Sequence, residues 1–543
     1  MLIEELVKRY DSLKSQRNTV QESWDTISDY VTPYRGRFFN DERNESSIEW
    51  SRTRKVYDST AVSAHQNLAA HIHGALTSPS LRWFVMRFRD EELNSNVQAA
   101  QWIEDASARV YWELSDSDFS LEVMEVYQDL CGYGTAAITL DKRPGYGWTG
   151  LDFAAVPLKE ICFEEDAFGG VLRFYRLLQW TPSEIITKFG DDVPEIIKTM
   201  EEAGNMEKQD ILFAIYPTGN KVVEVGKRVS ASRRPWEFVY ILKNSSEQLG
   251  KKGSYYEMPA FIPRWRKTSS SIWGNSPAHV ALGDILSLND ARKMQLKMAE
   301  RLIDPPLFVD ERTIMADLDI SAGSLNVVRS VEGIMPFQTG GSIPVSDHMI
   351  QQLQDAVKDY FFVDQLTFPR PQGTPMSATE AMIRQEQLAK LIGPTLGRLQ
   401  NDMLDPIVSR AFRMLARAGQ IEPPPDIVLQ SDAQFDIEYL GSLSRAQHVD
   451  EAASIERWVM QAAQLAEIFP DALDVVDPDE MMRYTGRALS VPAGVMRSDE
   501  EVEELRDARQ EKQRQMEEAM IAEQQGKAQQ AQGEGQQAMG GPA

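Results

Sequence analysis

One stretch of the chain combines helical signals with residues that fix both of its ends. Ser276 and Pro277 are residue types preferred at the N-cap and at the first position of a helix. The residues that then supply apolar surface are Val280, Leu282, Ile285, Leu286, Met294, Leu296 and Leu302. Asp304-Pro305-Pro306 ends the stretch, because proline cannot continue a helix. The sequence therefore predicts a long helix over residues 277–303.

A second helix is expected after a change of pattern. Residues 307–344 are rich in Gly, Val and Ile without a helical period, which predicts a small β unit. Ser346 is a candidate N-cap for the next helix. The apolar residues that would share one face of it are Ile350, Leu353, Val357 and Phe361. Two helices joined by a β-rich insertion are therefore predicted.

A proline-rich break follows the second helix. The run from Phe368 to Pro375 holds three prolines and one glycine, which exclude a helix and an inner strand. Ser377 to Glu380 then form a capping box that opens a long helix. Pro394 and Pro406 predict kinks in that helix, and Gly419 is a candidate C-cap.

The rest of the chain indicates a mainly helical α+β protein. A first helix is predicted from apolar residues three and four apart, with Arg17 filling one gap: Leu6, Tyr10, Leu13, Val20, Trp24, Ile27 and Val31. Helical pattern resumes over 59–76 and 97–114. Strands are predicted at 136–140, 211–216, 236–242 and 260–265. Further helices are expected at 444–469 and from Ser498, before a Gln-, Ala- and Gly-rich tail from 526 that should be disordered.

Composition narrows the protein class. No apolar run approaches the length of about 20 residues that a membrane helix needs, and the N-terminal residues do not read as a signal peptide. We expect a soluble protein made in a cytoplasm. Two distant cysteines, Cys131 and Cys162, exclude a disulfide framework. The net charge of −25 contrasts with the basic excess of proteins that grip nucleic acid. Either nucleic acid is irrelevant, or the protein touches DNA without holding it.

Candidate chemical motifs each have a simpler structural explanation. Gly132-Tyr133-Gly134-Thr135 lacks the lysine of a phosphate-binding loop, and a turn into a strand is favoured. His71 and His73 point to different faces of a helix and could form a metal site with His65 only by a coincidence of the fold. Asp116-Ser117-Asp118 is expected to end a helix. We therefore expect no metal site.

Other motifs also give no catalytic centre. Arg264-Trp265-Arg266-Lys267 could contact phosphates and stack on bases, but a strand end with solvated charges is favoured. No Gly-x-Ser-x-Gly elbow occurs, and no carboxylate pair stands out. The helix from Ser498 is charged nearly all round, so it is either solvated or packed against copies of itself. We expect no enzymatic activity and no cofactor.

Four runs of residues occur in a fixed order along most of the chain. They are Pro263-Arg264-Trp265 with Trp273–Ala278 and Leu282–Asn289; Asp304–Leu307; Ser377–Glu380 with Arg384, Leu391–Asn401 and Leu404–Pro406; and Tyr439–Gln447. Together they resemble the head-to-tail connector, or portal, family of podovirus-type bacteriophages. Trp273 stands where tyrosine is usual in that family, and Ser442 where proline is usual.

The resemblance implies a portal fold assembled as a ring, usually of twelve subunits. Its wing would comprise residues 1–275 and a crossing helix and return at 377–443. Its stem would be two helices at 276–303 and 346–363, with the clip between them at 304–345. A tunnel loop would occupy 364–376, a helical crown 444–525, and a disordered tail 526–543.

The same resemblance implies partners and site residues. Double-stranded DNA would pass non-specifically through the ring, along a tunnel loop that includes Phe368, Pro369, Arg370, Gln372 and Thr374. Arg370 would meet phosphates or form a salt bridge to a neighbouring subunit. The clip residues Asp310, Glu311, Arg312 and Arg329 would contact the terminase large subunit and later the adaptor and tail proteins. Major capsid and scaffold proteins would contact the wing, and the protein would reside at a capsid vertex of the virion.

Two other functions remain open at this point. The first is a nucleotide- or metal-dependent enzyme, for example a nuclease built from acidic pairs, which would bind divalent metal and turn over substrate. The second is a different virion scaffold or assembly protein without a DNA channel. Oligomer geometry separates the second from a portal, because a portal closes around a bore.

Overall fold

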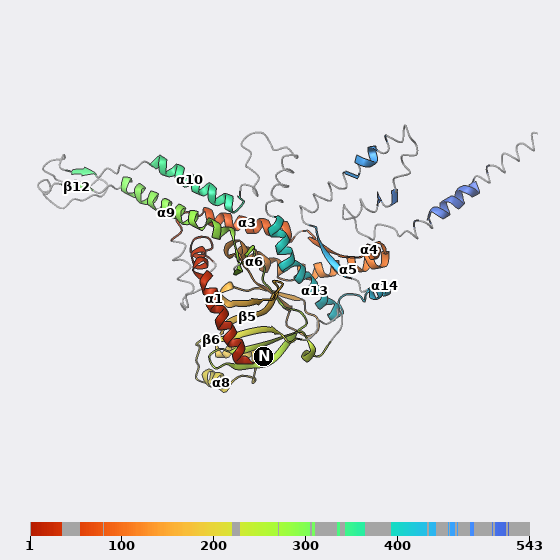
Figure 1. Ribbon diagram of the computed structural model, residues 1–543, viewed down its shortest axis with the longest axis horizontal. Coiled ribbons are helices and arrows are strands. Elements are labelled where there is room, and N and C mark those ends of the chain that lie inside the picture. Colours follow the sequence, from red (N-terminus) through yellow and green to blue (C-terminus); the bar gives the residue numbers. More distant parts are fainter. Residues whose placement is uncertain are drawn as a thin grey trace, which may run out of the picture. The chain divides into compact units, whose positions relative to one another are not determined.

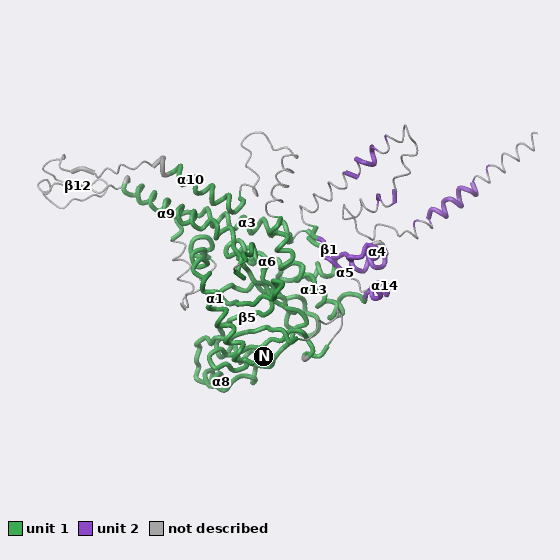
Figure 2. Tube along the Cα trace, viewed as in Figure 1, with its two compact units in different colours: residues 1–85, 106–423, 439–443 green, residues 86–105, 424–438, 444–543 purple. Residues whose placement is uncertain are grey.

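The computed structural model describes most of the first 440 residues. The described ranges are 2–34, 55–79, 81–219, 229–269, 271–303, 307–309, 334–336, 343–363, 393–431 and 434–440, with short helical pieces between 454 and 520. They divide into two compact units (Figure 2). Unit 1 comprises residues 1–85, 106–423 and 439–443, and unit 2 comprises 86–105, 424–438 and 444–543.

Unit 1 is built on a five-stranded antiparallel sheet. Its strands follow one another in chain order: β4 (Ile161–Glu165), β5 (Val171–Trp180), β6 (Gln209–Pro217), β7 (Trp236–Leu242) and β8 (Glu247–Tyr255). The strands predicted at 211–216 and 236–242 are confirmed as β6 and β7. The predicted run 136–140 overlaps β2 (Ile138–Lys142), which lies between β3 (Leu151–Ala155) and the two-residue β9 (Ala260–Phe261) in a second sheet.

The first helix, α1 (Ile3–Tyr30), covers one face of the five-stranded sheet (Figure 1). Leu6 and Tyr10 pack there against Cys162, Tyr175, Leu212 and Val239. Residues alternate between the faces of a strand, so Ile211 and Leu242 turn to the other face. They pack there with Ile185 of α7 (Pro182–Phe189) and Ile197 of α8 (Glu195–Glu202). The sheet is therefore covered on both sides.

Arg17 lies on the buried face of α1, in the gap of the apolar pattern. Its Nη1 donates hydrogen bonds to the carbonyl oxygens of Leu158, Lys159 and Ile161, at 3.2, 2.8 and 2.7 Å. These carbonyls belong to the turn that leads into β4. Arg17 therefore extends the contact between α1 and the sheet with hydrogen bonds. A smaller apolar side chain at this position would leave these three carbonyl groups without that partner.

The other helices of unit 1 form a layer beside the sheets. The helices predicted at 59–76 and 97–114 are confirmed as α3 (Thr60–Leu76) and α5 (Val97–Asp116), the second of which runs through both units. α6 (Phe119–Tyr133) packs against α3. Asp118, at the turn after α5, accepts a hydrogen bond from the Phe153 amide at 3.1 Å. The predicted helix-ending turn at Asp116–Asp118 is thus confirmed.

The long helix after the proline-rich break contains a wider turn. A π-helical turn at Gln400–Leu404 precedes α13 (Asp405–Ala418). Pro406 has no N–H to bond the Asp402 carbonyl, and the wider turn accommodates that loss. Gly419 ends α13 with a left-handed φ of 75°, as predicted for the C-cap.

Unit 2 contains a two-stranded sheet and short helices. β1 (Phe84–Phe88) pairs with β14 (Phe435–Tyr439), and the unit also holds α4 (Glu91–Ser95) and α14 (Asp426–Gln430). Phe88 and Trp102 stack with ring centroids 6.3 Å apart. Arg87 and Glu438 form an ion pair at 2.6 Å between the two strands. No helix among the described residues is long and apolar enough to cross a membrane.

An arginine network ties α13 to the β structure of unit 1. Arg410, which is 5% exposed, donates from Nε to the Leu140 carbonyl at 3.1 Å and from Nη1 to the Glu257 carbonyl at 2.8 Å. The Glu257 carboxylate accepts two hydrogen bonds from Arg417, at 2.6 and 2.7 Å. The Glu257 carboxylate also forms an ion pair with Arg410 at 3.4 Å, so one carboxylate serves two cations of α13.

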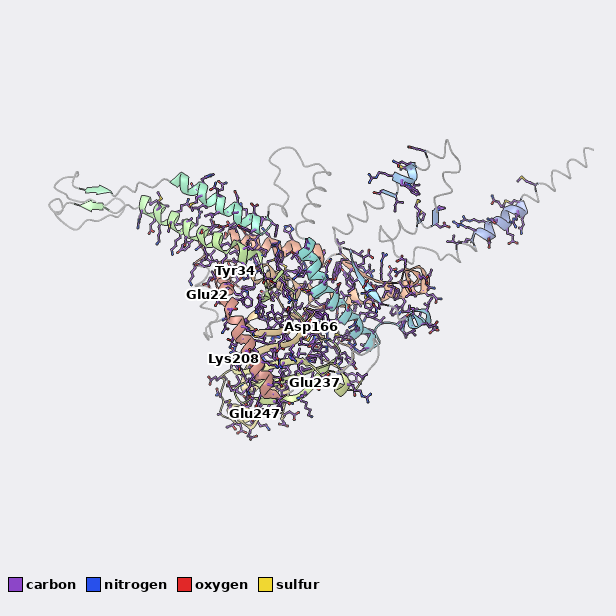
Figure 3. All side chains as sticks on the ribbon, in the orientation of Figure 1. Glu22, Tyr34, Asp166, Lys208, Glu237 and Glu247 are labelled. Carbon is purple, nitrogen blue, oxygen red and sulfur yellow. The ribbon has the colours of Figure 1, made fainter. Side chains whose placement is uncertain are left out.

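Replacing that carboxylate should destabilise unit 1. Glu257→Gln leaves Arg410 and Arg417 buried with less compensating charge, so we expect the free energy of unfolding to fall by about 3 kcal/mol. Denaturant titration of the purified chain measures this. The control is Glu247→Gln at an exposed residue (labelled in Figure 3), which should change stability by less than about 0.5 kcal/mol. Equal shifts in both variants would contradict the role given to Glu257.

Candidate functional site

Two helices and a small pair of strands form a hairpin in unit 1 (Figure 1). α9 (Pro277–Ile303) and α10 (Ile343–Tyr360) lie side by side. β12 (Leu307–Val309) and β13 (Ile334–Pro336) pair antiparallel between them, with Phe308 opposite Met335. We call this element the α9–α10 hairpin. The helix predicted over 277–303 and the β unit predicted after it are both confirmed.

The start of α10 differs from the prediction. Ser346 was expected to be the N-cap, but the helix already begins at Ile343. Pro344 therefore lies in its first turn, where a helix does not require the missing N–H. The proline acts here as a helix-starting residue, and the predicted boundary was wrong.

Hydrogen bonds set the register of the two helices. The Asn289 Oδ1 atom of α9 accepts from the Tyr57 amide at 2.7 Å. The Gln354 Nε2 atom of α10 donates to Asp58 Oδ2 at 2.8 Å, next to Tyr57 in the chain. Farther along, Gln295 donates to Asp347. Asn289 therefore lies level with Gln354, and Gln295 lies level with Asp347.

The root of α9 is held by Ser276. Its Oγ accepts a hydrogen bond from the His279 amide at 3.1 Å, which confirms Ser276 as the N-cap. The same Oγ donates to the Gly132 carbonyl near the end of α6 at 2.6 Å. One hydroxyl group therefore caps α9 and joins it to α6.

Two glycines bring the same two segments together at the level of the backbone. Gly134 ends α6 with a φ of 77°. A Cβ added there would lie 2.4 Å from the Gly274 oxygen, and one added at Gly274 would lie 2.1 Å from the Gly134 oxygen. The Gly274 amide donates to Thr135 Oγ1 at 2.8 Å. The Gly132–Thr135 run is therefore a helix end and a turn into a strand, as the sequence favoured.

Trp273 packs the joint from the side. Its ring makes edge contacts with Trp24 of α1 and with Phe163 of β4, each at a centroid distance of 5.0 Å. Trp273 occupies a position where the resembled family usually has tyrosine, and here the larger ring fills the space between helix and sheet. Sequence reasoning gave this residue no role, because its two partners are distant in the chain.

His279 lies beside this joint. Its Nδ1 is 2.7 Å from Ser276 Oγ, and its Nε2 is 3.5 Å from Ser23 Oγ of α1. Burial lowers the pKa of His279 to about 4, because the charged imidazolium loses hydration there. The side chain is therefore neutral at neutral pH and acts in packing and hydrogen bonding.

The basic-aromatic run 264–267 requires a correction. A strand end with solvated charges was favoured, but Arg264 is 5% exposed and Trp265 is 3% exposed. Arg264 forms ion pairs with Glu165 and, at 3.7 Å, with Asp402. Lys267 is ion-paired to Glu165 at 2.6 Å. Arg264 is buried because two acidic groups from distant segments meet it, and neither Arg264 nor Trp265 is accessible to nucleic acid. Arg266 and Lys267 are exposed in β10 (Arg266–Thr268), so the prediction of solvated charges is confirmed for these two residues.

The histidines of the helical layer have separate partners. His65 Nε2 donates to the Gln128 carbonyl at 2.7 Å, and His73 Nε2 lies 3.2 Å from the Ser120 carbonyl. Burial lowers the pKa of His73 and of His71. Among the described residues no group of three His, Cys, Asp or Glu side chains could hold a metal ion.

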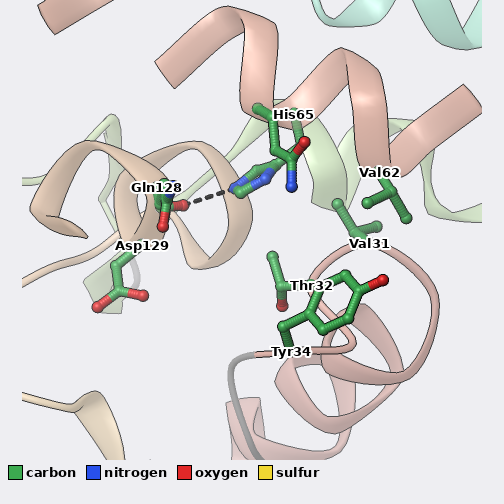
Figure 4. A pocket seen from close by; sticks show the side chains of 8 residues that line it. Val31, Thr32, Tyr34, Val62, His65, Gln128 and Asp129 are labelled. Atoms are coloured by element: carbon green, nitrogen blue, oxygen red, sulfur yellow. Dashed lines mark hydrogen bonds between the residues drawn. The ribbon is translucent and has the colours of Figure 1, made fainter. Parts of the chain in front are cut away.

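A cavity of about 190 Å³ lies next to His65 (Figure 4). Its lining comes from the end of α1, from α3 and from α6, namely Val31, Thr32, Tyr34, Val62, His65, Gln66, Gln128 and Asp129. The lining mixes aliphatic, hydroxyl and amide groups with the imidazole of His65 and the carboxylate of Asp129. The imidazole is held by its hydrogen bond to the Gln128 carbonyl.

The predicted contact residues lie outside the described part of the chain. This holds for the tunnel-loop residues Phe368, Pro369, Arg370, Gln372 and Thr374, and for the clip residues Asp310, Glu311, Arg312 and Arg329. Their roles stay predictions. Sequence reasoning missed Asn289 and Gln354, which fix the register of the hairpin. A polar Asn289 within an apolar helix face was the available signal for the first of them.

Comparisons with known proteins agree on one family. A family model described as bacteriophage head to tail connecting protein matches residues 4–496. The chain is 27% identical over 490 residues to a probable portal protein of Bordetella phage BPP-1, covering 87% of this chain and 85% of that protein. It is 25% identical over 519 residues to the portal protein of Salmonella phage epsilon15, covering 93% and 91%.

The buried His279 should make stability depend on pH. Between pH 6.5 and about 4 the unfolded chain binds a proton that the folded chain does not, so the free energy of unfolding should fall as pH falls through this window. Above pH 6.5 His279 is neutral in both the folded and the unfolded chain, so it adds no pH dependence to the free energy of unfolding. His279→Gln should reduce the slope of the denaturation midpoint against pH. His348→Gln, at an exposed residue of α10, should keep it. Equal slopes in the wild type and His279→Gln would refute the prediction.

Proposed function

The chain belongs to the family of bacteriophage head to tail connecting proteins, and on that premise we propose that it is a portal protein. Subunits would assemble as a dodecameric ring at one capsid vertex, and double-stranded DNA would pass through the ring during packaging and ejection. The names of two phage relatives, each matched over most of both chains, support this proposal. The protein would be made in the host cytoplasm and become part of the virion.

The α9–α10 hairpin is the observation that carries the proposal. Two long helices leave the α+β part of unit 1 and hold a small strand pair between them (Figure 1). A conduit needs such an element, because helices repeated around an axis can line a bore while the strands extend beyond it. We assign the stem to α9 and α10 and the clip to residues 304–345.

The remaining parts are assigned by their position in the chain. The tunnel loop would be 364–376, the wing 1–275 and 377–443, the crown 444–525, and the tail 526–543. Arg370 would be the tunnel-loop cation that meets phosphates. The clip would bind the terminase large subunit and then adaptor and tail proteins, and the wing would contact capsid and scaffold proteins. The packaging motor would hydrolyse the nucleotide, so the portal itself would be no enzyme.

The net charge of the chain suits a conduit for DNA. In the hairpin, exposed carboxylates such as Asp290 and Asp355 occur beside exposed cations such as Lys297 and Arg301. The chain as a whole carries a net charge of −25. A ring of such subunits has a negative potential that repels phosphates and keeps the duplex from sticking. Weak contact lets the duplex slide.

Electron microscopy of the purified full-length protein tests the proposal. We expect end-on views of closed rings with about twelvefold symmetry and a central bore wide enough for duplex DNA. Closed oligomers without a bore would reject the conduit and favour a virion scaffold without a channel. A chain that stays monomeric even when coexpressed with its scaffold protein would reject the ring.

The tunnel-loop assignment has its own test. Replacing Phe368–Pro375 with a Gly-Ser linker of equal length should leave rings intact, because the three prolines and the glycine of this run exclude a helix and an inner strand. The DNA content of assembled particles should fall, because the loop would no longer meet the duplex. The control is a Gly-Ser replacement of Asn244-Ser245-Ser246, the turn between β7 and β8. Wild-type DNA yield in the first variant would reject the assignment.

A further inference from the structure

One aromatic side chain is fully presented to solvent at the turn between β4 and β5. Phe168 is 97% exposed, so its ring contacts almost nothing in the described chain. The fold of unit 1 does not require an aromatic residue here, and small polar residues are the usual choice in an exposed turn. Single exposed apolar residues are common on proteins, but this one is held in a position that several bonds fix. We call residues 166–170 the Phe168 turn.

Asp166 (labelled in Figure 3) fixes the Phe168 turn from within. Its Oδ1 atom accepts hydrogen bonds from the amides of Phe168 and Gly170, each at 2.8 Å. The backbone adds two bonds, from the Asp166 amide to the Gly170 carbonyl at 2.9 Å and from the Gly169 amide to the Asp166 carbonyl at 3.2 Å. Gly169 has a φ of 87°, which residues with a side chain rarely adopt. The backbone is therefore fixed on both sides of Phe168.

The folded body holds the same turn from outside. Arg264, which is 5% exposed, donates from Nη2 to the Gly169 carbonyl at 3.2 Å. Glu165, the last residue of β4, forms ion pairs with Arg264 and Lys267. The ring of Phe168 therefore projects from a turn that is bonded to the core. A contact residue that is fixed before binding lowers the entropy cost of association, as expected of an anchor in a protein interface.

Cations lie beside the Phe168 turn. A Cβ added at Gly169 would lie 3.6 Å from the Lys267 Nζ atom. Burial raises the pKa of Asp402, although three nearby cations oppose the rise, namely Arg264, Arg398 and Lys267. Arg398 is half-buried, and no ion pair among the described residues includes it. The exposed ring is therefore presented beside a cationic surface, although the whole chain carries a net charge of −25.

The chemistry of this surface selects the kind of partner. Duplex DNA keeps its bases stacked on one another, so an exposed ring finds no base to stack on. The cavity beside His65 of a second copy is also a poor host, because its imidazole, amide and carboxylate groups would lose hydration against a benzyl ring. A different protein, with an apolar pocket and carboxylates at its rim, complements both the ring and the cations.

The size of the surface limits the strength of each contact. One turn of five residues covers far less area than a stable protein interface needs, so a single copy would bind weakly and reversibly. Repetition around a ring gives such a contact a higher apparent affinity, because several copies engage one partner assembly at once. A reversible contact suits a partner that is released after assembly better than a shell that stays in the particle.

We propose that Phe168 is the anchor by which each subunit binds the scaffold protein, with its ring inserted into an apolar pocket that carries carboxylates at the rim. This inference rests on the proposed function, in which scaffold and capsid proteins contact the wing. It assigns that contact with the scaffold to one rigid turn and its neighbouring cations.

Binding of purified scaffold protein to purified rings of the full-length chain tests the anchor. Phe168→Ser removes the ring and should raise the apparent Kd at least about tenfold, because a few anchor residues carry most of the energy of an interface. The variant should still form rings, because the bonds of the turn use the backbone and Asp166. The control is Tyr146→Ser, at another fully exposed aromatic residue of unit 1, which should leave the Kd unchanged.

Two further variants test the setting of the anchor. Asp166→Ala keeps the ring but loosens the turn, and Arg398→Glu reverses the charge of a cation beside it. Each should raise the Kd severalfold, and the wild-type Kd should rise with salt, because salt screens the cationic surface. Unchanged Kd values in both variants would contradict the fixed cationic setting of the anchor, and with it the proposal.

The remaining outcomes separate this inference from the proposed function. Equal Kd values in the wild type and Phe168→Ser, or wild-type rings that bind no scaffold protein, would overturn the anchor and leave the portal proposal in place. The same holds if Phe168→Ser loses rings, loses binding of the purified capsid protein alone, or loses binding of duplex DNA, because each result identifies a different occupant. A wild type that forms no rings would overturn both proposals.

Discussion

The close approach of Gly134 and Gly274 is the constraint on which the rest of unit 1 depends. Any side chain at either position would overlap the carbonyl oxygen of the other, so the end of α6 and the strand before α9 meet as bare backbone. Ser276 and Thr135 add hydrogen bonds across the same contact. The direction of α9 is therefore set by the folded body and not by the helix itself.

The second helix of the hairpin depends on a different kind of contact. α10 is placed by the buried side chains of Ile350, Val357 and Phe361. Two hydrogen bonds add to this packing, one donated by Gln354 to Asp58 and one donated by Gln295 to Asp347. Such bonds fix the level of the helix along α9, while its outer flank stays uncovered by the described chain. A hairpin with a rigid root and a fixed register has the same shape in every copy, as the proposed ring requires.

Local sequence signals allowed part of the fold of unit 1 to be predicted, above all the ends of its helices. The ends of α9 and the C-cap at Gly419 follow from residue types that act within one turn of a helix, and the structure confirms them. Arg264 shows where that reasoning stops. Its burial depends on Glu165 and Asp402, which reach it only through the folded chain. The start of α10 was misplaced because a proline can either end one element or begin the next.

The distribution of cations reconciles an acidic chain with a DNA conduit. Arg17, Arg264 and Arg410 are each nearly buried and bond carbonyl groups or carboxylates inside unit 1. These positive charges hold helices to sheets and are not available to phosphates. α9 and α10 carry exposed carboxylates, and α9 also carries exposed cations, among them Lys297 and Arg301. The acidity of the chain therefore argues against a protein that grips DNA, but it agrees with a ring that lets the duplex slide.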